Sequence, residues 1–427
     1  MRAEPMPSVP LRARTVATET GSRWAGRLAR LWARRGVRGE ARIDAWLTAR
    51  TRVDLRARWR EATERAGFGE KLLTPLGGFG TGGLPLLTHV QPGRGLGDPA
   101  YLIVRLRPGQ TLAALAEAAD ELAAGLGCWG VRLRPRGVDH VRVDLIEHDP
   151  LAAPVPFLPP HSAGELVFGI DEHAATVTVP LDELTHLTVQ GATRSGKSAW
   201  TYSLLAQLAA RPHVDIAGID PTGLLLRPFG PHPRGWRVTG TDHPQRYADA
   251  IAAVVAEMDR RIAALPPRAD TVPLGPACPL LVVVLEEWAA VGRLVGHTRA
   301  KPSAVHRSVA RLLAEGAKAG IRVVTIVQRA EADVVGAFER DQALTRLSFA
   351  VNDINTLKML HPEVTPEQAD VHATSPKGVA LLTGPGLPLL RLRGPWIGGY
   401  GAYCDHIAAT DAACPGTPTH PGWEAAA

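Results

Sequence analysis

The sequence contains little cysteine. Four of its 427 residues are cysteine, and no two have the Cys-x-x-Cys spacing, which argues against a disulfide framework and a zinc ribbon. Cys404, His406, Cys414 and His420 lie near one another in the sequence, but their spacing fits no standard metal finger. This cysteine usage favours a reducing, cytoplasmic compartment.

Long apolar runs are also absent. No window of about 18 consecutive apolar residues occurs, and the N-terminus has no apolar stretch behind its charges. We therefore expect neither a membrane span nor a signal peptide. Any contact with a membrane would have to be peripheral or made through a membrane-protein partner.

The positive charge is unevenly distributed. Residues 1–70 hold sixteen arginines against eight acidic residues, an excess of eight, so the rest of the chain contributes −2 to the net charge of +6. Such clustering is typical of a segment that meets a polyanion, either nucleic acid or an anionic membrane surface. The alternative is compositional, because the chain uses arginine in place of lysine almost throughout and arginine runs then arise without a role.

Changes in residue pattern divide the chain into four segments. Residues 1–75 combine a basic leader with amphipathic helices, in which apolar residues recur at helical spacing between arginines. Residues 76–150 open with a Gly/Pro-rich stretch and continue as a small α/β module, with two strands around Arg136-Gly137. Residues 151–395 form the largest domain, after a proline-rich linker, and residues 396–427 read as a loop-like tail.

The largest domain alternates short β-rich runs with helical ones. The predicted strands are LTHLTVQ, VDIAGID, LLVVVLEE and IRVVTIVQ, with helical patterns between them. Alternation of this kind predicts an α/β fold with a mostly parallel sheet covered by helices on both faces.

A phosphate-binding loop follows the first of these strands. The segment GATRSGKS, Gly191–Ser198, matches G-x-x-x-x-G-K-[ST] at every specified place. Its backbone amides and the helix that begins at Lys197 can hold the phosphates of ATP, while Lys197 neutralises their charge and Ser198 contacts Mg²⁺. We expect nucleotide contacts from the whole loop and the start of the helix: Gly191, Ala192, Thr193, Arg194, Ser195, Gly196, Lys197, Ser198 and Ala199.

An acidic pair and a glutamine end two further strands. Glu286 and Glu287 follow a run of apolar residues, where a P-loop protein needs one acid for the magnesium shell and one to polarise the attacking water. Glu286 stands where Asp is usual, and its extra methylene puts the rate of hydrolysis in question but not nucleotide binding. Gln328 ends the strand IRVVTIVQ and suits a sensor of the γ-phosphate.

Several motifs in order resemble the FtsK/SpoIIIE family of DNA-translocating ATPases, including the TraB-like transfer proteins of actinobacterial conjugative elements. They span about residues 145–395, and they are VQGATRSGKS, GIDPTG, AVVAEMDRR, LLVVVLEEWAAV, AEGAKAGIRVVTIVQRAEADVV, LTRLSFAVNDINTLKML and SPKGVALL. The resemblance implies a RecA-like motor core that forms a hexameric ring around double-stranded DNA and moves it with ATP.

The resemblance also suggests an arginine that reaches a neighbouring subunit's nucleotide. Arg346 falls where the family's pattern carries an arginine, and Arg329 is the competing candidate; in so arginine-rich a chain, a surface ion pair is the ordinary alternative. The sequence departs from the family in two ways. An arginine-rich segment stands where members commonly carry membrane helices, and too few residues follow Trp396 for a winged-helix domain.

The function expected from these observations is an ATP-driven double-stranded DNA translocase acting in plasmid or conjugative-element transfer or in DNA segregation. The alternative is a nucleotide-binding DNA adaptor or regulator with little hydrolysis, which the Glu286-Glu287 pair favours. A P-loop kinase fits less well, because no phosphoacceptor pocket or lid-like arginine cluster is evident.

Overall fold

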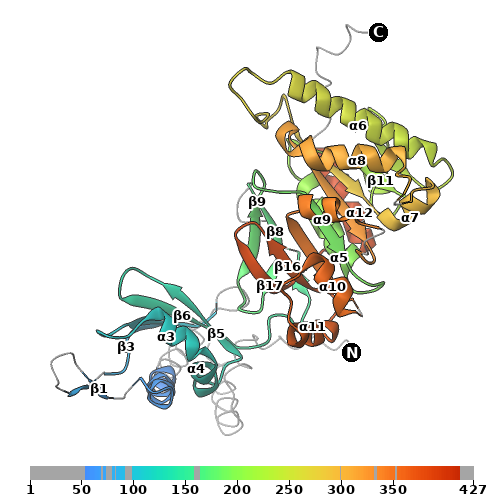
Figure 1. The fold of residues 1–427 in the computed structure, drawn as a ribbon. Helices are drawn as coiled ribbons and strands as arrows, with labels where there is room; N and C mark the ends of the chain where they lie inside the picture. Colours follow the sequence, from blue (N-terminus) through green and yellow to red (C-terminus); the bar gives the residue numbers. More distant parts are fainter. Residues whose placement is uncertain are drawn as a thin grey trace, which may run out of the picture. The chain divides into compact units, whose positions relative to one another are not determined.

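The computed structural model describes residues 53–68, 71–73, 79–81, 83–91, 99–157, 164–298, 300–330, 334–351 and 353–413. The arginine-rich residues before 53 and the last residues from 414 lie outside this description, and with them Cys414 and His420. The chain divides into two compact units, Met1–Asp149 and Pro150–Ala427 (Figure 1). Each unit is described by itself. No helix in the described ranges is long and apolar enough to cross a membrane.

The first unit contains a four-stranded antiparallel sheet in the order β3-β4-β6-β5. Residues 53–65 are helical. The other elements of this unit are β1 (Lys71–Leu73), β2 (Phe79–Thr81), β3 (Leu86–Gln91), β4 (Tyr101–Arg105), α3 (Leu112–Glu117), α4 (Ala119–Leu126), β5 (Gly130–Pro135) and β6 (His140–Ile146).

The helix at residues 53–65 belongs to the core of this module, which corrects the segment boundary expected at residue 75. Leu55, Trp59 and Ala62 recur at helical spacing and are buried in one cluster with α3, α4 and one face of the sheet. The indole of Trp59 donates a hydrogen bond to the carbonyl of Pro85, 3.2 Å away. The apolar stripe of this helix therefore completes a core that the strands and two short helices leave open.

The second unit is built on a ten-stranded sheet in the order β12-β11-β13-β14-β10-β15-β16-β17-β8-β9. The strands of this unit are β7 (Val155–Pro156), β8 (Glu165–Asp171), β9 (Thr176–Pro180), β10 (Leu187–Gln190), β11 (Val214–Asp220), β12 (Arg237–Thr239), β13 (Leu280–Leu285), β14 (Ile321–Val327), β15 (Thr345–Phe349), β16 (Val379–Gly384), β17 (Leu387–Arg393) and β18 (Pro395–Trp396), of which β7 and β18 form a separate two-stranded sheet. Its helices are α5 (Lys197–Ala209), η3 (Arg227–Phe229), α6 (Gln245–Ala263), α7 (Trp288–Leu294), α8 (Ala304–Glu315), η4 (Gly316–Ala319), α9 (Ala337–Gln342), α10 (Ile354–Leu360), α11 (Pro366–Ala373) and α12 (Tyr400–Ala413).

The large sheet is mixed, so the expectation of a mostly parallel sheet was too simple. The strands from β12 to β15 pair in parallel, whereas β15, β16, β17, β8 and β9 pair antiparallel. Short connections explain two of the four antiparallel pairs. Only Pro385 and Gly386 separate β16 from β17, and residues 172–175 separate β8 from β9. So short a turn joins antiparallel strands, whereas a parallel pair needs a long crossover.

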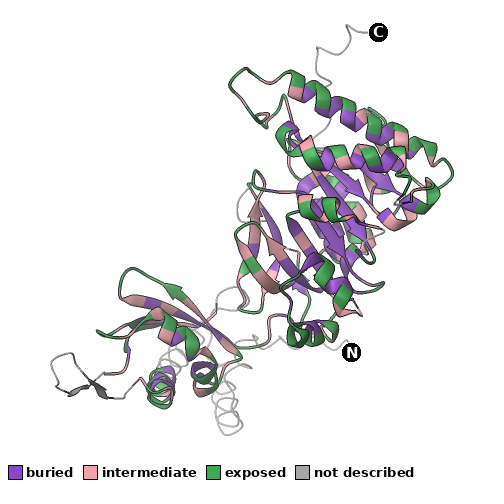
Figure 2. Ribbon diagram, viewed as in Figure 1, coloured by how far each residue is buried: buried purple, intermediate pink, exposed green. Residues whose placement is uncertain are grey.

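Helices cover both faces of the parallel part, as expected. Side chains of β13 alternate between two cores: Leu280, Val282 and Val284 face a cluster with α5 and α12, and Leu281 and Val283 face a cluster with α6, α7 and α8. Figure 2 shows the resulting buried central strands between helices whose outer sides are exposed. A strand buried on both sides carries apolar residues at every position, which is why LLVVVL has no polar alternation.

The segment after residue 396 is not the loop-like tail that was expected, because residues 400–413 form α12. Tyr403 and Ile407, one helical turn apart, are fully buried against the large sheet's core, and the Tyr403 hydroxyl donates to the carbonyl of Leu225 at 2.7 Å. The Tyr403 ring also stacks on that of Tyr202 of α5. Tertiary packing therefore makes an ordered helix of a segment whose glycines and alanines suggested a loop.

Cys128, Cys278 and Cys404 are free thiols. Within the described ranges, no group of three or more His, Cys, Asp or Glu side chains is arranged to hold a metal ion.

Candidate nucleotide-binding site

The loop at Gly191–Ser198 joins the carboxyl end of β10 to the start of α5, as the motif predicted. Gly196 has a φ of +112°, and a Cβ there would lie 2.6 Å from the backbone nitrogen of Gly378. A Cβ on Gly191 would lie 2.6 Å from the Ser195 hydroxyl oxygen. Both positions therefore exclude larger residues, Gly196 through its backbone conformation as well as its crowding.

The loop is held in shape by neighbouring backbone. The amide of Ala192 donates to the carbonyl of Ala350 at 2.9 Å, and the carbonyl of Ser195 accepts from the amide of Gly378 at 2.8 Å. Thr193, Arg194 and Ser198 are exposed. Arg194 has a positive φ of 68°. These backbone hydrogen bonds thus fix the loop and leave its tip and the Ser198 hydroxyl accessible.

Lys197 is buried at the start of α5 with its ammonium directed at two other strand ends. Its Nζ donates to the carbonyl of Val327 at 3.2 Å and lies 3.8 Å from Oε1 of Glu287. Burial lowers the pKa of Lys197, while the carboxylates of Glu287 and Glu286 oppose that shift. The ammonium is therefore held by weak partners beside the loop, where a phosphate oxygen would replace them.

Gln328 and Glu287 are in direct contact. β14 lies between β13 and β10 and pairs in parallel with both, so the residues after these strands meet at one edge of the sheet. The amide nitrogen of Gln328 donates to both carboxylate oxygens of Glu287, each at 3.3 Å. Glu287 has a φ of 47°, a left-handed conformation that costs free energy in a residue other than glycine. Lys197, Glu287 and Gln328 thus come together from three elements.

Glu286 is held in a different environment from its neighbour. Burial raises its pKa to about 8, and the negative charges of Asp220 and Glu287 add to the rise, while Lys197 opposes it. Its Oε2 atom is buried and has no hydrogen-bond partner. A carboxyl oxygen left unpaired in this way is a place where a cation would satisfy it.

The donors available for magnesium are oxygen atoms. Ser198 offers an exposed hydroxyl at the loop, and Glu286 offers the unpaired carboxyl oxygen at the end of β13. Mg²⁺ prefers oxygen ligands and keeps several waters, so one hydroxyl and one carboxylate beside a nucleotide suffice. These residues fit the ion.

Asp220 was not singled out from the sequence. Its carboxylate is fully buried and accepts hydrogen bonds from the Thr222 hydroxyl and from the amides of Gly223, Leu225 and Leu226, at 2.8 to 2.9 Å. It shapes the loop after β11 and raises the pKa of Glu286. The signal was present in GIDPTG, where an Asp at a strand end precedes Pro-Thr-Gly and favours a turn closed by its own side chain.

Arg346 is not brought to this loop. It pairs with Thr188, two residues before the end of β10, and its guanidinium donates to the carbonyls of Ala343, Leu360 and Arg340. Arg329 directly follows Gln328 and is exposed. Within one chain, Arg346 therefore binds nearby backbone carbonyls, whereas Arg329 lies nearer to the site formed by Lys197, Glu287 and Gln328.

A hollow of about 260 Å³ opens beside the loop. Among the residues that line it are Gly196, Ala199, Pro154, Lys377 and Trp396. The Trp396 side chain, on β18, is 48% exposed. An aromatic ring beside the first turn of α5 offers a flat apolar surface next to the place where phosphates would bind.

Comparison with known proteins places this site in context. Residues 153–268 match the model of the FtsK/SpoIIIE family. The chain is 27% identical to the DNA translocase FtsK of Staphylococcus aureus (strain COL) over 213 residues, which is 45% of this chain and 26% of that protein. It is 28% identical over 209 residues to the DNA translocase FtsK of Listeria monocytogenes serovar 1/2a, covering 44% of this chain and 26% of the relative. The match thus spans about a quarter of the length of these relatives.

A solved structure is also similar. The monomer form of the pCW3 conjugation coupling protein TcpA with ATPγS aligns with a TM-score of 0.49 and 15% identity, over 83% of this chain and 99% of that one.

Proposed function

We propose that this chain, which contains a P-loop ATPase domain of the FtsK/SpoIIIE family, is an ATP-driven translocase of double-stranded DNA. The observation that carries the proposal is the convergence of Lys197, Glu287 and Gln328 beside the loop at Gly191–Ser198. We take DNA as the substrate because the relatives that match this chain are named DNA translocases. The resemblance of the sequence motifs to those of TraB-like transfer proteins extends the proposal to plasmid or conjugative-element transfer or DNA segregation.

The loop would bind the phosphates of ATP. Its backbone amides and the amino end of α5 attract the anion, and Lys197 exchanges the Val327 carbonyl for phosphate oxygens. Ser198 and Glu286 would hold Mg²⁺, which neutralises charge on the β- and γ-phosphates when bound. Glu286 must lose its proton for this, and the nearby Lys197 ammonium favours that loss.

Glu287 would orient and activate the water that attacks the γ-phosphate. As a carboxylate within reach of the loop, it can accept a proton from that water. Gln328 fixes the carboxylate by donating to both oxygens, and its position at the end of β14 lets it respond when the γ-phosphate leaves. Coupling of this kind would link hydrolysis to movement of β14 and the loops that follow it.

The hollow beside the loop would take the adenine base and ribose. Trp396 provides a partly exposed ring for stacking, and its neighbours Gly196 and Ala199 connect the hollow to the phosphate site. The base is thereby directed away from the acidic pair, which keeps the γ-phosphate next to Glu287.

The active form would be a ring of identical subunits, six by resemblance to the family, encircling double-stranded DNA. In such a ring an arginine from one subunit contacts the γ-phosphate held by the next. Arg346 was the first candidate, but its three carbonyl bonds favour a local structural role. Arg329, two residues after β14, is exposed and can therefore face a neighbouring subunit, and we propose it for that contact.

Steady-state ATP hydrolysis tests the proposal. We expect linear duplex DNA at low salt to raise turnover several-fold, added salt to suppress the stimulation, and Lys197→Ala to abolish turnover. Binding of ATP with turnover at background, whatever DNA is supplied, would contradict the translocase. It would favour instead a nucleotide-binding DNA adaptor or regulator, a role that the raised pKa of Glu286, which stands in place of Asp, also supports.

A further inference from the structure

The four-stranded sheet of the first unit has one face without helices in the described part of the chain. The helix at 53–65, α3 and α4 pack on the other face. On the uncovered face and its β5–β6 turn lie five arginines, Arg105, Arg132, Arg134, Arg136 and Arg142, which we call the arginine face. The arginines contribute five positive charges against the two negative charges of Asp139 and Asp144, an excess of three.

One buried carboxylate organises three of these arginines. Asp144 of β6 is 0% exposed and accepts from Arg132 at 3.1 Å, from Arg134 at 2.6 Å and from Arg142 at 2.6 Å. A guanidinium has five N–H donors, so each arginine keeps donors for another partner. Their side chains are fixed along the sheet before any ligand arrives, which lowers the entropic cost of binding one.

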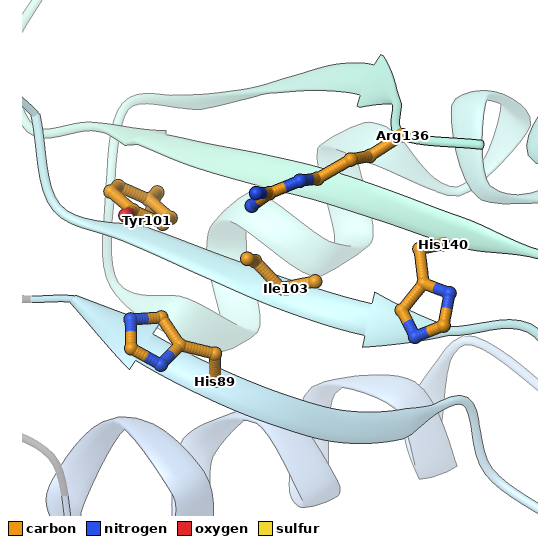
Figure 3. A pocket seen from close by; sticks show the side chains of 5 residues that line it. All are labelled: His89, Tyr101, Ile103, Arg136 and His140. Atoms are coloured by element: carbon orange, nitrogen blue, oxygen red, sulfur yellow. The ribbon is translucent and has the colours of Figure 1, made fainter.

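A shallow hollow of about 620 Å³ lies on the same face. Figure 3 shows the five side chains that line it, His89, Tyr101, Ile103, Arg136 and His140, on one side of the strands, with helices on the other side. The exposed Arg136 reaches over this hollow from the turn between β5 and β6. The hollow is therefore a basic depression open to solvent.

We propose that the arginine face binds the phosphate backbone of double-stranded DNA. The excess positive charge and the spare guanidinium donors match phosphate oxygens. Single-stranded DNA would use free aromatic rings to stack its bases. Here Arg142 lies 3.7 Å from the centre of the Tyr101 ring, and the imidazole of His89 lies 6.0 Å from it, so the ring already has partners.

This inference takes its partner, duplex DNA, from the proposed function and adds a contact outside the ATPase unit. Contacts to phosphate alone are independent of base sequence, which suits a protein that moves along DNA. The arginine face lies in the unit without the phosphate loop, so its grip on DNA needs no nucleotide. It would hold the duplex through stages in which the ATPase unit releases it.

The test measures binding of the full-length chain to a labelled duplex by fluorescence anisotropy, without nucleotide, over a range of salt. The double variant Arg134→Gln/Arg136→Gln should weaken binding about tenfold and make the slope of log K against log salt shallower by about 1.8, since each lost phosphate contact removes about 0.9. The matched control is Arg307→Gln/Arg311→Gln, which removes two exposed arginines from α8 of the other unit. It should leave both quantities unchanged.

The outcomes separate this inference from the proposed function. If the parent binds duplex and the Arg134/Arg136 variant binds equally well, the inference is wrong and the translocase stands. If the parent binds no DNA and DNA does not stimulate its ATP hydrolysis, both are wrong. Tighter binding of single-stranded DNA, or binding of phosphatidylglycerol vesicles in place of DNA through these arginines, would also overturn it.

Folding is checked in the same samples. The unfolding temperature of the double variant is compared with that of the parent, and its basal ATP hydrolysis should be unchanged. If the double variant unfolds at a lower temperature than the parent, the single variant Arg136→Gln tests the inference instead, because Arg136 is exposed and lies in the turn between β5 and β6. Its expected slope change is about 0.9, and an unchanged slope would overturn the inference.

Discussion

The side-chain amide of Gln328 holds both carboxylate oxygens of Glu287, at 3.3 Å each. The two residues are 41 positions apart in the chain and meet because β14 pairs with β13. The contact ties the residue proposed to activate water to the residue proposed to detect the γ-phosphate. We therefore make a separate prediction for each of the two residues.

Glu287→Gln should abolish the activation of water and leave the nucleotide in place. We expect kcat for ATP hydrolysis to fall about a hundredfold or more, the range for loss of a general base, with ATP affinity changed little. The measurement pairs steady-state hydrolysis with equilibrium ATP binding. Glu315→Gln, which neutralises a half-exposed acid on α8, is the matched control and should leave both values as in the parent.

Gln328→Ala should lower kcat about tenfold, because Glu287 loses the donor that orients it. The same change made in the Glu287→Gln protein should have almost no further effect, since the interaction is already altered. A double-mutant cycle on kcat measures this. Equal effects of Gln328→Ala in both backgrounds would show that Gln328 acts independently of Glu287 and contradict the arrangement.

Trp396→Ala should weaken ATP binding through loss of base stacking. Stacking of a base on an aromatic side chain contributes about 1–3 kcal/mol, so we expect affinity to fall about 5- to 150-fold. Trp396→Phe should retain most of it. Tripolyphosphate, which has no base, should bind the parent and the Ala variant alike. A similar loss of affinity for tripolyphosphate would show that Trp396 acts by supporting the structure of the loop and not by stacking on the base. The control is Trp129→Ala, which changes another exposed tryptophan.

His361 should make the ATPase unit less stable in mild acid. The imidazole is fully buried between the hydroxyls of Ser348 and Thr383, at 2.8 and 3.1 Å. Burial lowers its pKa to about 3, and the positive charges of His372 and Arg346 contribute. Because the pKa rises to about 6.5 on unfolding, the stabilisation is complete above pH 6.5 and declines as pH falls towards 3.

The expected contribution is about 1.4 kcal/mol per pH unit within that window, or about 2 kcal/mol between pH 6.5 and pH 5. Urea unfolding at both pH values measures it. His361→Gln should reduce the difference between the two pH values by that amount, whatever its effect at pH 7. The exposed His173→Gln is the control, and an unchanged difference in His361→Gln would contradict the prediction.

The local parts of the site could be predicted from the sequence. A P-loop is one continuous segment with a fixed spacing, so GATRSGKS indicated its strand, its glycines and the start of α5. The pattern of buried strands likewise predicted helices on both faces.

The parts that were missed depend on tertiary packing. The antiparallel half of the sheet includes a pair of strands far apart in the chain, β17 and β8, and α12 is fixed by burial of Tyr403 and Ile407. The burial of Asp220 and the carbonyl partners of Arg346 involve residues brought together only in the folded chain. Hydrophobic periodicity gives no information on such contacts. The roles expected of Arg346 and of the N-terminal arginines remain predictions.

The measurement that tests translocation most directly is ATP-driven displacement of a third strand bound to duplex DNA. The full-length chain moving along the duplex should release the labelled third strand with ATP, and Lys197→Ala should release none. If the parent hydrolyses ATP on the same DNA and leaves the third strand bound, the chain is a DNA-stimulated ATPase that does not translocate, and the central claim is wrong.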